Sequence, residues 1–426
     1  MKYSELDRTS LLQEQEKCKA AFEELKGKGL KLDMSRGKPG KAQLDLVSDI
    51  LTVLSDPADC IDDGTDVRNY GTLAGLPSAK RLFAEILGCK PEECFIGGNA
   101  SLTLMYDTIS KAYSHGLLHS EQPWCKLDKV KFLCPAPGYD RHFRITESFG
   151  AELITVEMTP TGPDMDMVER LVSEDEEIKG IWCVPTYSNP TGISYSDTVV
   201  KRFAALKPKA DDFRIYWDNA YTIHHLYNGK EEKLLEILNE CKKAGNPDMV
   251  FKFCSTSKVT FPGSGIAALG ASKKNLDFVK SIITIQTIGH DKLNQLRHVR
   301  YFKNIEGMNA HMRKHAEIIR PKFELVERVL SKELGDLDIG TWTKPNGGYF
   351  VSFNALNGCA KQIVGMCKEA GVTLTGAGAT YPYKNDPDDS NIRIAPTFPP
   401  SEELEKALEI FVLCVKLVSV NKYLEA

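Results

Sequence analysis

Short apolar runs alternate with amphipathic stretches along the first two thirds of the chain. The runs are rich in β-branched and aromatic residues, which is typical of strands buried on both faces. Between them, apolar residues recur three or four positions apart, the spacing of a helix with one buried side. This alternation predicts βαβ units and a mostly parallel sheet. The expected strands are CFIGG (94–98), KVKFLCP (129–135), ELITVEM (152–158), IKGIWCVP (178–185), FRIYWD (213–218) and MVFKFC (249–254), and the clearest helices cover 101–116, 164–174 and 196–207.

The pattern changes near residue 305. A long charged helical stretch is followed by the strand-like GGYFVSF and NIRIAP, each leading to another helix, which predicts a smaller α+β domain. An amphipathic helix that ends near Gly27 or Gly29 is expected to pack against that domain. The predicted parts are residues 1–50, which pack with the small domain, 51–304, the large domain, and 305–426, the small domain.

Composition excludes several classes of function. The net charge is −4, from 54 basic and 58 acidic residues, so nothing favours nucleic acid or an anionic membrane. The 12 cysteines form no C-x-x-C pair and no zinc-like cluster, which indicates a reducing cytoplasm and no metal site. No apolar run of about 18 residues is present, so we expect no membrane span.

Polar residues follow five of the predicted strands directly. Because ligands of open α/β sheets bind beyond the carboxyl ends of the strands, these residues are expected to meet at one site. The five exits are NAS after CFIGG, APGYDRH after KVKFLCP, TYSNPTG after IKGIWCVP, NAY after FRIYWD and STSK after MVFKFC.

Lys258 follows the last of these strands among small hydroxyl residues. In a partly desolvated pocket a lysine loses its proton more readily, and its amine forms Schiff bases with aldehydes. Ser255 and Ser257 offer hydroxyls to a phosphate, and Asp218 needs a cationic partner at its apolar strand end. One ligand with an aldehyde, a phosphate and a ring nitrogen, pyridoxal 5′-phosphate, explains the set.

The residues that follow the other strands have purely structural interpretations beside the ligand-binding ones. The turn before Ser101 suits an anion at a helix N-terminus, although such turns are common without a ligand. Tyr139 offers a flat face or simply packs, and His142 supports a carboxylate or is structural. Asn189 donates to a ligand oxygen or only forms a turn, and Asp218 holds a cofactor or only a buried salt bridge.

The ordered set of motifs resembles a fold-type I pyridoxal-phosphate-dependent aminotransferase of the aspartate aminotransferase class. The resemblance covers nearly the whole chain and implies a mostly parallel seven-stranded-type sheet between helices, with a smaller α+β domain. MSRGKPG, TSKVTFPGSG and IGHDKLNQLRH resemble a divergent subgroup related to the aminotransferase domain of MocR-type regulators. The ordered motifs are RNYGTLAGLPSAKRLFAEILG, GGNAS, PGYDRH, NPTG, D-x-x-Y, S-x-S-K, GGYF and NIRIAP.

The resemblance implies a role for each matching residue. Lys258 forms the Schiff base and moves the proton, Asp218 binds the ring nitrogen, and Tyr221 and Asn189 bind the phenolic oxygen. Arg393 binds the substrate α-carboxylate and Gly37 lies against the substrate. Tyr139 stacks on the cofactor, His142 backs Asp218, Asn99, Ala100, Ser101, Ser255 and Ser257 surround the phosphate, and Tyr70 reaches the phosphate of the second subunit of a homodimer.

Two positions depart from the family pattern. Ile266 stands where the family has an arginine that pairs with the phosphate, and Ser264 or backbone N–H groups are expected to replace it. Arg141, Lys292 and Arg297 are candidates for the missing charge. The arginine that binds the distal carboxylate of aspartate has no counterpart, so Lys292, Asn294 or Gln295 is expected to contact the substrate side chain across the dimer.

The expected activity is amino transfer between L-aspartate and 2-oxoglutarate by a ping-pong mechanism. A β-lyase or an aminocyclopropane-carboxylate-synthase-like enzyme would use the same pocket and break a different bond. A cofactor-sensing regulatory module is a further alternative. About thirty residues precede MSRGKPG, fewer than a winged helix-turn-helix needs, so an enzyme is expected.

Overall fold

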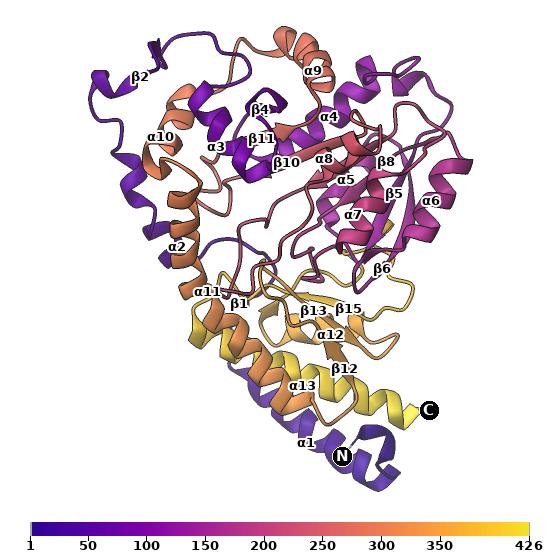
Figure 1. Ribbon diagram of the computed structural model, residues 1–426. Coiled ribbons are helices and arrows are strands. Elements are labelled where there is room, and N and C mark those ends of the chain that lie inside the picture. Colours follow the sequence, from indigo (N-terminus) through magenta and orange to yellow (C-terminus); the bar gives the residue numbers. More distant parts are fainter. Residues whose placement is uncertain (1, 426) are drawn as a thin grey trace.

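The computed structural model describes residues 2–425 and contains one large sheet (Figure 1). In spatial order its eight strands are β4 (Cys94–Ile96), β11 (Ala267–Gly270), β10 (Val250–Ser255), β9 (Arg214–Asp218), β8 (Ile178–Cys183), β5 (Lys131–Ala136), β6 (Glu152–Thr159) and β7 (Gly162–Pro163). The central strands from β10 to β6 are parallel. Strand β11 is antiparallel to both its neighbours, and β7 is antiparallel to β6.

This sheet confirms the predicted α/β class, and six of its strands were predicted from the apolar runs. Strands β11 and β7 were not. The AALG sequence of β11 has no β-branched or aromatic residue, so it lacks the composition of a strand. Its conformation follows from hydrogen bonds to β10 on one side and β4 on the other.

Helices cover both faces of the sheet because its strands are apolar on both sides. In β9, Ile215 and Trp217 share one apolar cluster, while Tyr216 between them belongs to another. The first cluster includes α6 (Met165–Glu174), α7 (Asp197–Ala204) and α8 (Ile237–Lys243). The second includes α4 (Ser101–His115), α5 (Asp140–Ser148) and α9 (Lys273–Gln286), so the predicted helices at 101–116, 164–174 and 196–207 are all present.

A smaller sheet lies in the C-terminal part of the chain. Its antiparallel strands are β12 (Gly340–Trp342), β13 (Val351–Ala355) and β15 (Asn391–Ile394), and it is accompanied by α11 (Ile305–Leu334), α12 (Ala360–Glu369) and α13 (Ser401–Glu425). Helix α1 (Arg8–Gly27) runs beside α13 (Figure 1), and β1 (Leu32–Asp33) pairs with β14 (Val372–Thr373). One apolar cluster joins Phe22 and Leu25 of α1 to these elements. The division at residues 50 and 304 stays a prediction, and its outer limits, residues 1 and 426, lie outside the described residues.

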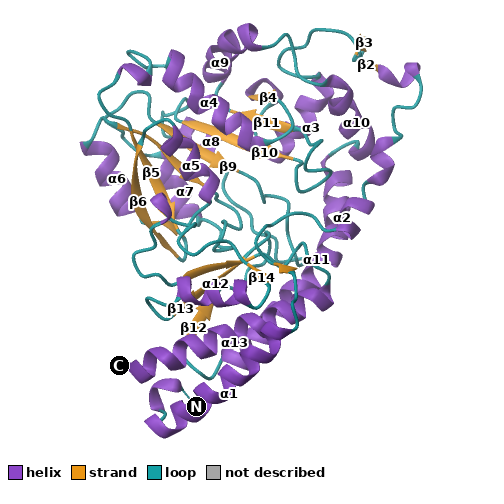
Figure 2. Cartoon of the chain, turned by 180° about the vertical axis from the view of Figure 1, so that it is seen from behind, coloured by secondary structure: helices purple, strands orange, loops and turns teal. Residues whose placement is uncertain are grey.

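Loops gather between the two sheets (Figure 2). The other elements are α2 (Lys41–Asp45), α3 (Pro77–Leu87), α10 (Lys292–Phe302), β2 (Ile61–Asp62), β3 (Thr65–Asp66) and the 3-10 helices Tyr3–Glu5, Ser48–Leu51, Pro57–Cys60, Pro91–Glu93, Trp124–Lys126 and Pro382–Lys384.

Within residues 2–425, each helix is too short or too polar to cross a lipid bilayer. The same residues contain no cluster of three side chains arranged to hold a metal ion.

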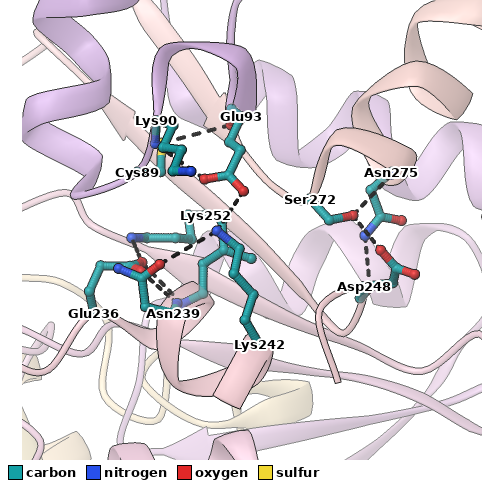
Figure 3. A network of polar contacts seen from close by, with 11 residues as sticks. Cys89, Lys90, Glu93, Glu236, Asn239, Lys242, Asp248, Lys252, Ser272 and Asn275 are labelled. Carbon is teal, nitrogen blue, oxygen red and sulfur yellow. Dashed lines mark hydrogen bonds and ion pairs between the residues drawn. The ribbon is translucent and has the colours of Figure 1, made fainter. Parts of the chain in front are cut away.

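A buried ion pair at Lys252 joins the large sheet to the helices that cover it (Figure 3). Lys252 of β10 is 2% exposed, and its ammonium group donates to the Glu236 carboxylate and to the Leu87 carbonyl at the end of α3. Glu236 also caps α8, since its two oxygens accept from the backbone N–H groups of Leu238 and Asn239. Lys252 therefore ties β10 to two helices with its charge fully compensated.

Candidate active site

Lys258 lies three residues beyond the carboxyl end of β10, within an aromatic wall. Its Nζ lies 4.8 Å from the ring centroid of Tyr221 and 6.0 Å from that of Tyr349. The Tyr349 hydroxyl donates to the Lys258 backbone carbonyl over 3.2 Å. Among residues 2–425, Nζ has no hydrogen-bond acceptor. Burial lowers the Lys258 pKa, Arg393 lowers it further, and Asp218 partly opposes the shift.

Burial also shifts the pKa of two groups near this amine toward their neutral forms. His224 lies edge-on to Tyr349, with ring centroids 5.5 Å apart, and burial with the nearby Lys258 lowers its pKa well below the usual value. Burial raises the pKa of Tyr221 well above that of a free phenol. These two side chains therefore supply no negative charge to a protonated lysine, and Asp218 is the charge that opposes the lowering of the Lys258 pKa.

Asp218 ends β9 and contacts His142 at the start of α5. The distance from His142 Nε2 to Asp218 Oδ2 is 2.9 Å, and the imidazole stacks on Trp182 at 4.6 Å. The second oxygen, Oδ1, is buried and has no hydrogen-bond partner among the described residues. A buried carboxylate oxygen without a partner is costly, so this site is suited to a further donor.

Hydroxyl groups gather where β10 and α4 meet. Ser255 Oγ donates to Ser257 Oγ over 3.1 Å and lies 3.4 Å from Ser101 Oγ. Ser101 is the first residue of the fifteen-residue helix α4, and Ala100 is its N-cap. Asn99 reaches across to donate to the Gly263 carbonyl over 3.1 Å. Free N–H groups of the first helical turn and the hydroxyls together suit a phosphate.

Ile266, which replaces the arginine of the family pattern, is part of the core. Its side chain is 2% exposed and its backbone N–H donates to Thr256 Oγ1 over 2.9 Å. The loop before it is fixed by Asn294 of α10, whose amide donates to the carbonyls of Ser264 and Gly265. Thr256 Oγ1 also lies 3.0 Å from His298 Nε2 on the same helix. This loop is therefore held by neutral hydrogen bonds.

Arg393 projects from β15 and is 7% exposed. Its Nη1 donates to Asp140 Oδ1 and to Asn189 Oδ1, both over 3.1 Å, and its Nη2 donates to Thr375 Oγ1 over 3.0 Å. The guanidinium carbon lies 4.8 Å from the Phe350 ring centroid. Its Nε is buried without a partner among residues 2–425, so the group retains donors for another ligand.

Gly37 lies against the same phenyl ring. A Cβ atom at position 37 would meet Cζ of Phe350 at 2.5 Å, so only glycine fits between the N-terminal segment and this ring. The segment around Gly37 is thereby brought close to Arg393, which lies over the same ring. The placement of Gly37 beside the substrate stays a prediction.

The structure brings most of the predicted residues to one region. Asn189 is buried and contacts Arg393, and Tyr139 contacts His142 edge-on at 4.8 Å. Burial, with Asp140 and Asp218 nearby, raises the pKa of Tyr139 to about 12. Tyr70 and Lys292 do not join this region. The Tyr70 side chain is 82% exposed, and within residues 2–425 no hydrogen bond or ring contact links it or Lys292 to the Lys258 cluster.

Sequence reasoning missed several residues that contact this cluster. Asp140 lies inside the quoted motif PGYDRH, but a charge at a helix start is usually solvated, and nothing in the pattern pairs it with Arg393. Gln43 donates to the Tyr349 hydroxyl over 2.9 Å and accepts from the Gly40 N–H. Thr375 and Tyr349 lie in stretches without strong periodicity. Tyr349, like Asp140, lies within a quoted motif, GGYF, which could have drawn attention to it.

The family model described as aspartate amino-transferase matches residues 6–426. The chain belongs to this family. An aspartate aminotransferase of Corynebacterium glutamicum is 44% identical over 408 residues, which cover 96% of this chain and 94% of that protein. A protein of Mycolicibacterium smegmatis named as an aminotransferase is 46% identical over 426 residues, 100% of this chain and 99% of the relative.

Solved structures agree with this assignment. The crystal structure of an aspartate transaminase from C. glutamicum has a TM-score of 0.96 and 43% identity, covering 99% of each chain. An α-aminoadipate aminotransferase of Thermus thermophilus has a TM-score of 0.73 at 18% identity, covering 92% of this chain and 93% of that one, and shares the fold alone. The predicted fold type and the predicted enzyme class, a transaminase, are confirmed.

Proposed function

We propose that the protein binds pyridoxal 5′-phosphate and transfers an amino group between L-aspartate and 2-oxoglutarate. The observation that carries the proposal is the pair formed by the Lys258 amine, whose pKa burial lowers, and an unpartnered, buried oxygen at Asp218. Aspartate as the donor is supported by the C. glutamicum relative. Two fold relatives were solved with a phosphopyridoxyl amino acid and with pyridoxamine phosphate.

The residues present fit this cofactor. Asp218 Oδ1 would accept from the ring nitrogen, and the amide of Asn189 and the hydroxyl of Tyr221 would donate to the phenolic oxygen. Tyr139 would stack on the ring and His142 would orient Asp218. The phosphate would be held by Asn99, Ala100, Ser101, Ser255 and Ser257.

When bound, the cofactor supplies an aldehyde for the lysine amine and a ring that takes up the electron pair released at Cα. Lys258, once displaced by the amino acid, accepts the Cα proton at Nζ as general base, which the lowered pKa favours. Asp218 would keep the ring nitrogen protonated. Lys258 Nζ would then release the proton that it carries, and the same residues would serve a second oxo acid in reverse. We therefore propose a ping-pong cycle.

Arg393 binds the substrate α-carboxylate through the donors that its protein partners leave free. Gly37 and Phe350 close the site beside it and exclude water. We propose that the aspartate side chain is bound by Lys292 from a second subunit. Among the described residues no carboxylate pairs with Lys292, so its charge is left for a ligand.

We propose a cytoplasmic homodimer with shared active sites. Tyr70 is 82% exposed, and exposed apolar side chains at Ile285 and Ile288 are 83% and 61% exposed. A large aromatic and two isoleucines in water are unfavourable, and a second copy would cover them. Tyr70 would then reach the phosphate of the partner subunit.

The test begins with the purified protein, which should be yellow and bind pyridoxal 5′-phosphate in an absorbance titration. With aspartate and 2-oxoglutarate it should form glutamate, and a panel of amino donors should place aspartate first. Release of pyruvate or ammonia in place of glutamate would favour the β-lyase reaction. Failure to bind the cofactor would contradict the proposal as a whole.

A further inference from the structure

The guanidinium of Arg393 has five N–H groups, and three are used by the protein. Both N–H groups of Nη1 are taken by Asp140 and Asn189, and one N–H of Nη2 is taken by Thr375. The N–H of Nε and the second N–H of Nη2 remain. These two N–H groups are the donors left for a carboxylate ligand. The three protein partners decide which pair stays free.

Thr375 is the partner that connects this group to another part of the chain. Its Oγ1 accepts from Arg393 Nη2 over 3.0 Å and donates to the Ser35 carbonyl over 2.7 Å. Arginine only donates and a carbonyl only accepts, so the direction of both hydrogen bonds is fixed. The hydroxyl is the sole group of Thr375 that makes both bonds.

The segment that Thr375 reaches is held at several points. Asp33 Oδ1 accepts from the N–H and the hydroxyl of Ser35, over 2.8 and 2.5 Å. Gly37 lies against the Phe350 ring, over which the Arg393 guanidinium also lies. Lys38 Nζ lies 3.7 Å from the Phe398 ring centroid. Residues 33–38 therefore run over the carboxylate-binding arginine, and Thr375 is a direct polar link between them.

We propose that Thr375 is a positioning residue that couples carboxylate binding at Arg393 to the order of residues 33–38. The coupling rests on the proposed role of Arg393 as the clamp of the substrate carboxylate. A carboxylate on the free N–H pair fixes the guanidinium, the guanidinium fixes the Thr375 hydroxyl, and the hydroxyl fixes the Ser35 carbonyl. Without the hydroxyl, Arg393 loses one orienting partner and the segment loses its polar tie.

The experiment uses the holoenzyme and maleate, an unreactive dicarboxylate. Thr375→Val keeps the shape and removes the hydroxyl, Thr375→Ser keeps the hydroxyl, and Thr373→Val changes an exposed threonine of the neighbouring strand β14 as a matched control. Maleate binding is followed by the absorbance of the cofactor. Order of the segment is followed by trypsin cleavage after Arg36, which is exposed, whereas Lys38 precedes a proline.

Thr375→Val is expected to weaken maleate binding about tenfold, because a hydrogen bond to a charged group is lost. Its KM for aspartate should rise about tenfold, while kcat and the absorbance without maleate stay within about twofold of the wild-type values. Maleate should protect the bond after Arg36 in the wild type, in Thr375→Ser and in Thr373→Val, and leave it open in Thr375→Val.

Equal maleate affinity and equal protection in Thr375→Val and the wild type would overturn the inference. So would a Thr375→Ser variant that behaves like Thr375→Val, since the hydroxyl would then not be the cause. If the wild type turns over aspartate while Thr375→Val is unchanged, the inference alone fails. If the wild type neither binds maleate nor turns over aspartate, the proposed role of Arg393 fails and the inference fails with it.

Discussion

Lys252 and Lys258 lie six residues apart in the sequence: Lys252 is buried within strand β10, and Lys258 is only partly exposed three residues beyond the end of that strand. Lys252 donates to a carboxylate and to a helix-terminal carbonyl, so its charge is compensated. Lys258 has no acceptor for its amine among the described residues and faces rings. A satisfied buried lysine stabilises the fold, whereas an unsatisfied one is available for chemistry.

The carboxylates beside the two lysines differ in the same way. Both oxygens of Glu236 accept hydrogen bonds, from Lys252 and from the first turn of α8. Asp218 uses one oxygen for His142 and leaves the other buried without a partner. The polar groups around Lys252 are therefore all paired, whereas those around Asp218 include one oxygen without a partner. Substitutions at the two places should affect different properties.

The largest expected effect is on catalysis. Lys258→Ala removes the nucleophilic amine and the general base together, so aspartate turnover should fall by about 10⁴-fold or more. Turnover is measured by coupled detection of oxaloacetate, and the visible band of the lysine-bound cofactor should disappear. Lys273→Ala, at an exposed lysine of α9, is the control and should keep wild-type activity. Residual activity within tenfold of the wild type would exclude the assigned role of Lys258.

At Lys252, the effect should be on stability. Lys252→Met leaves the Glu236 carboxylate without its cation, which costs about 3–5 kcal/mol of unfolding free energy for a buried pair. Urea denaturation measures the loss, and the specific activity of the folded variant should stay close to that of the wild type. Lys243→Met breaks an exposed pair with Glu240 on the same helix α8 and should change stability by less than about 0.5 kcal/mol. Equal stabilities of the two variants would contradict the comparison.

A smaller effect on rate is expected from the support of Asp218. His142→Asn removes the 2.9 Å contact to Oδ2, so the carboxylate is held less firmly under the ring nitrogen. We expect kcat to fall about tenfold, with the KM for aspartate nearly unchanged, because a hydrogen bond to a charged group is lost. Steady-state kinetics separate the two constants. His115→Asn on the exposed end of α4 should have no effect, and a change in KM alone would argue against this role for His142.

The smallest expected effect is a pH dependence of stability in the cofactor-free protein. Burial lowers the Lys258 pKa below 10.5, so the unfolded chain binds more protons than the folded one in that interval. The free energy of unfolding therefore rises with pH between the folded pKa and 10.5. Below the folded pKa the burial of the charged lysine destabilises the folded protein in full. Lys258→Met should remove this contribution and be slightly more stable than the wild type at pH 7. The prediction would be contradicted if the denaturation midpoints of the wild type and of Lys258→Met changed in parallel between pH 7 and 10.

Most residues of the candidate site were predicted from short motifs in the sequence. Asp218 ends a predicted strand and Asn189 and Lys258 each follow one, and the carboxyl ends of parallel strands meet at one edge, so their proximity could be inferred. Arg393 was predicted from its NIRIAP motif and the family resemblance. Its partners Asp140 and Thr375 were not, because they come from parts of the chain 253 and 18 residues away and have no shared pattern.

The sequence by itself determined the βαβ order, the strand exits and the lysine, because these depend on local periodicity and on residues adjacent in the chain. Tertiary structure alone decided strand β11, whose small residues become a strand only between two partners. It also decided which of the two lysines is satisfied, since Glu236 and Leu87 approach Lys252 from distant segments, whereas within residues 2–425 no acceptor approaches the Lys258 amine. Hydrogen-bond partners across such separations are set by packing, which no local pattern encodes.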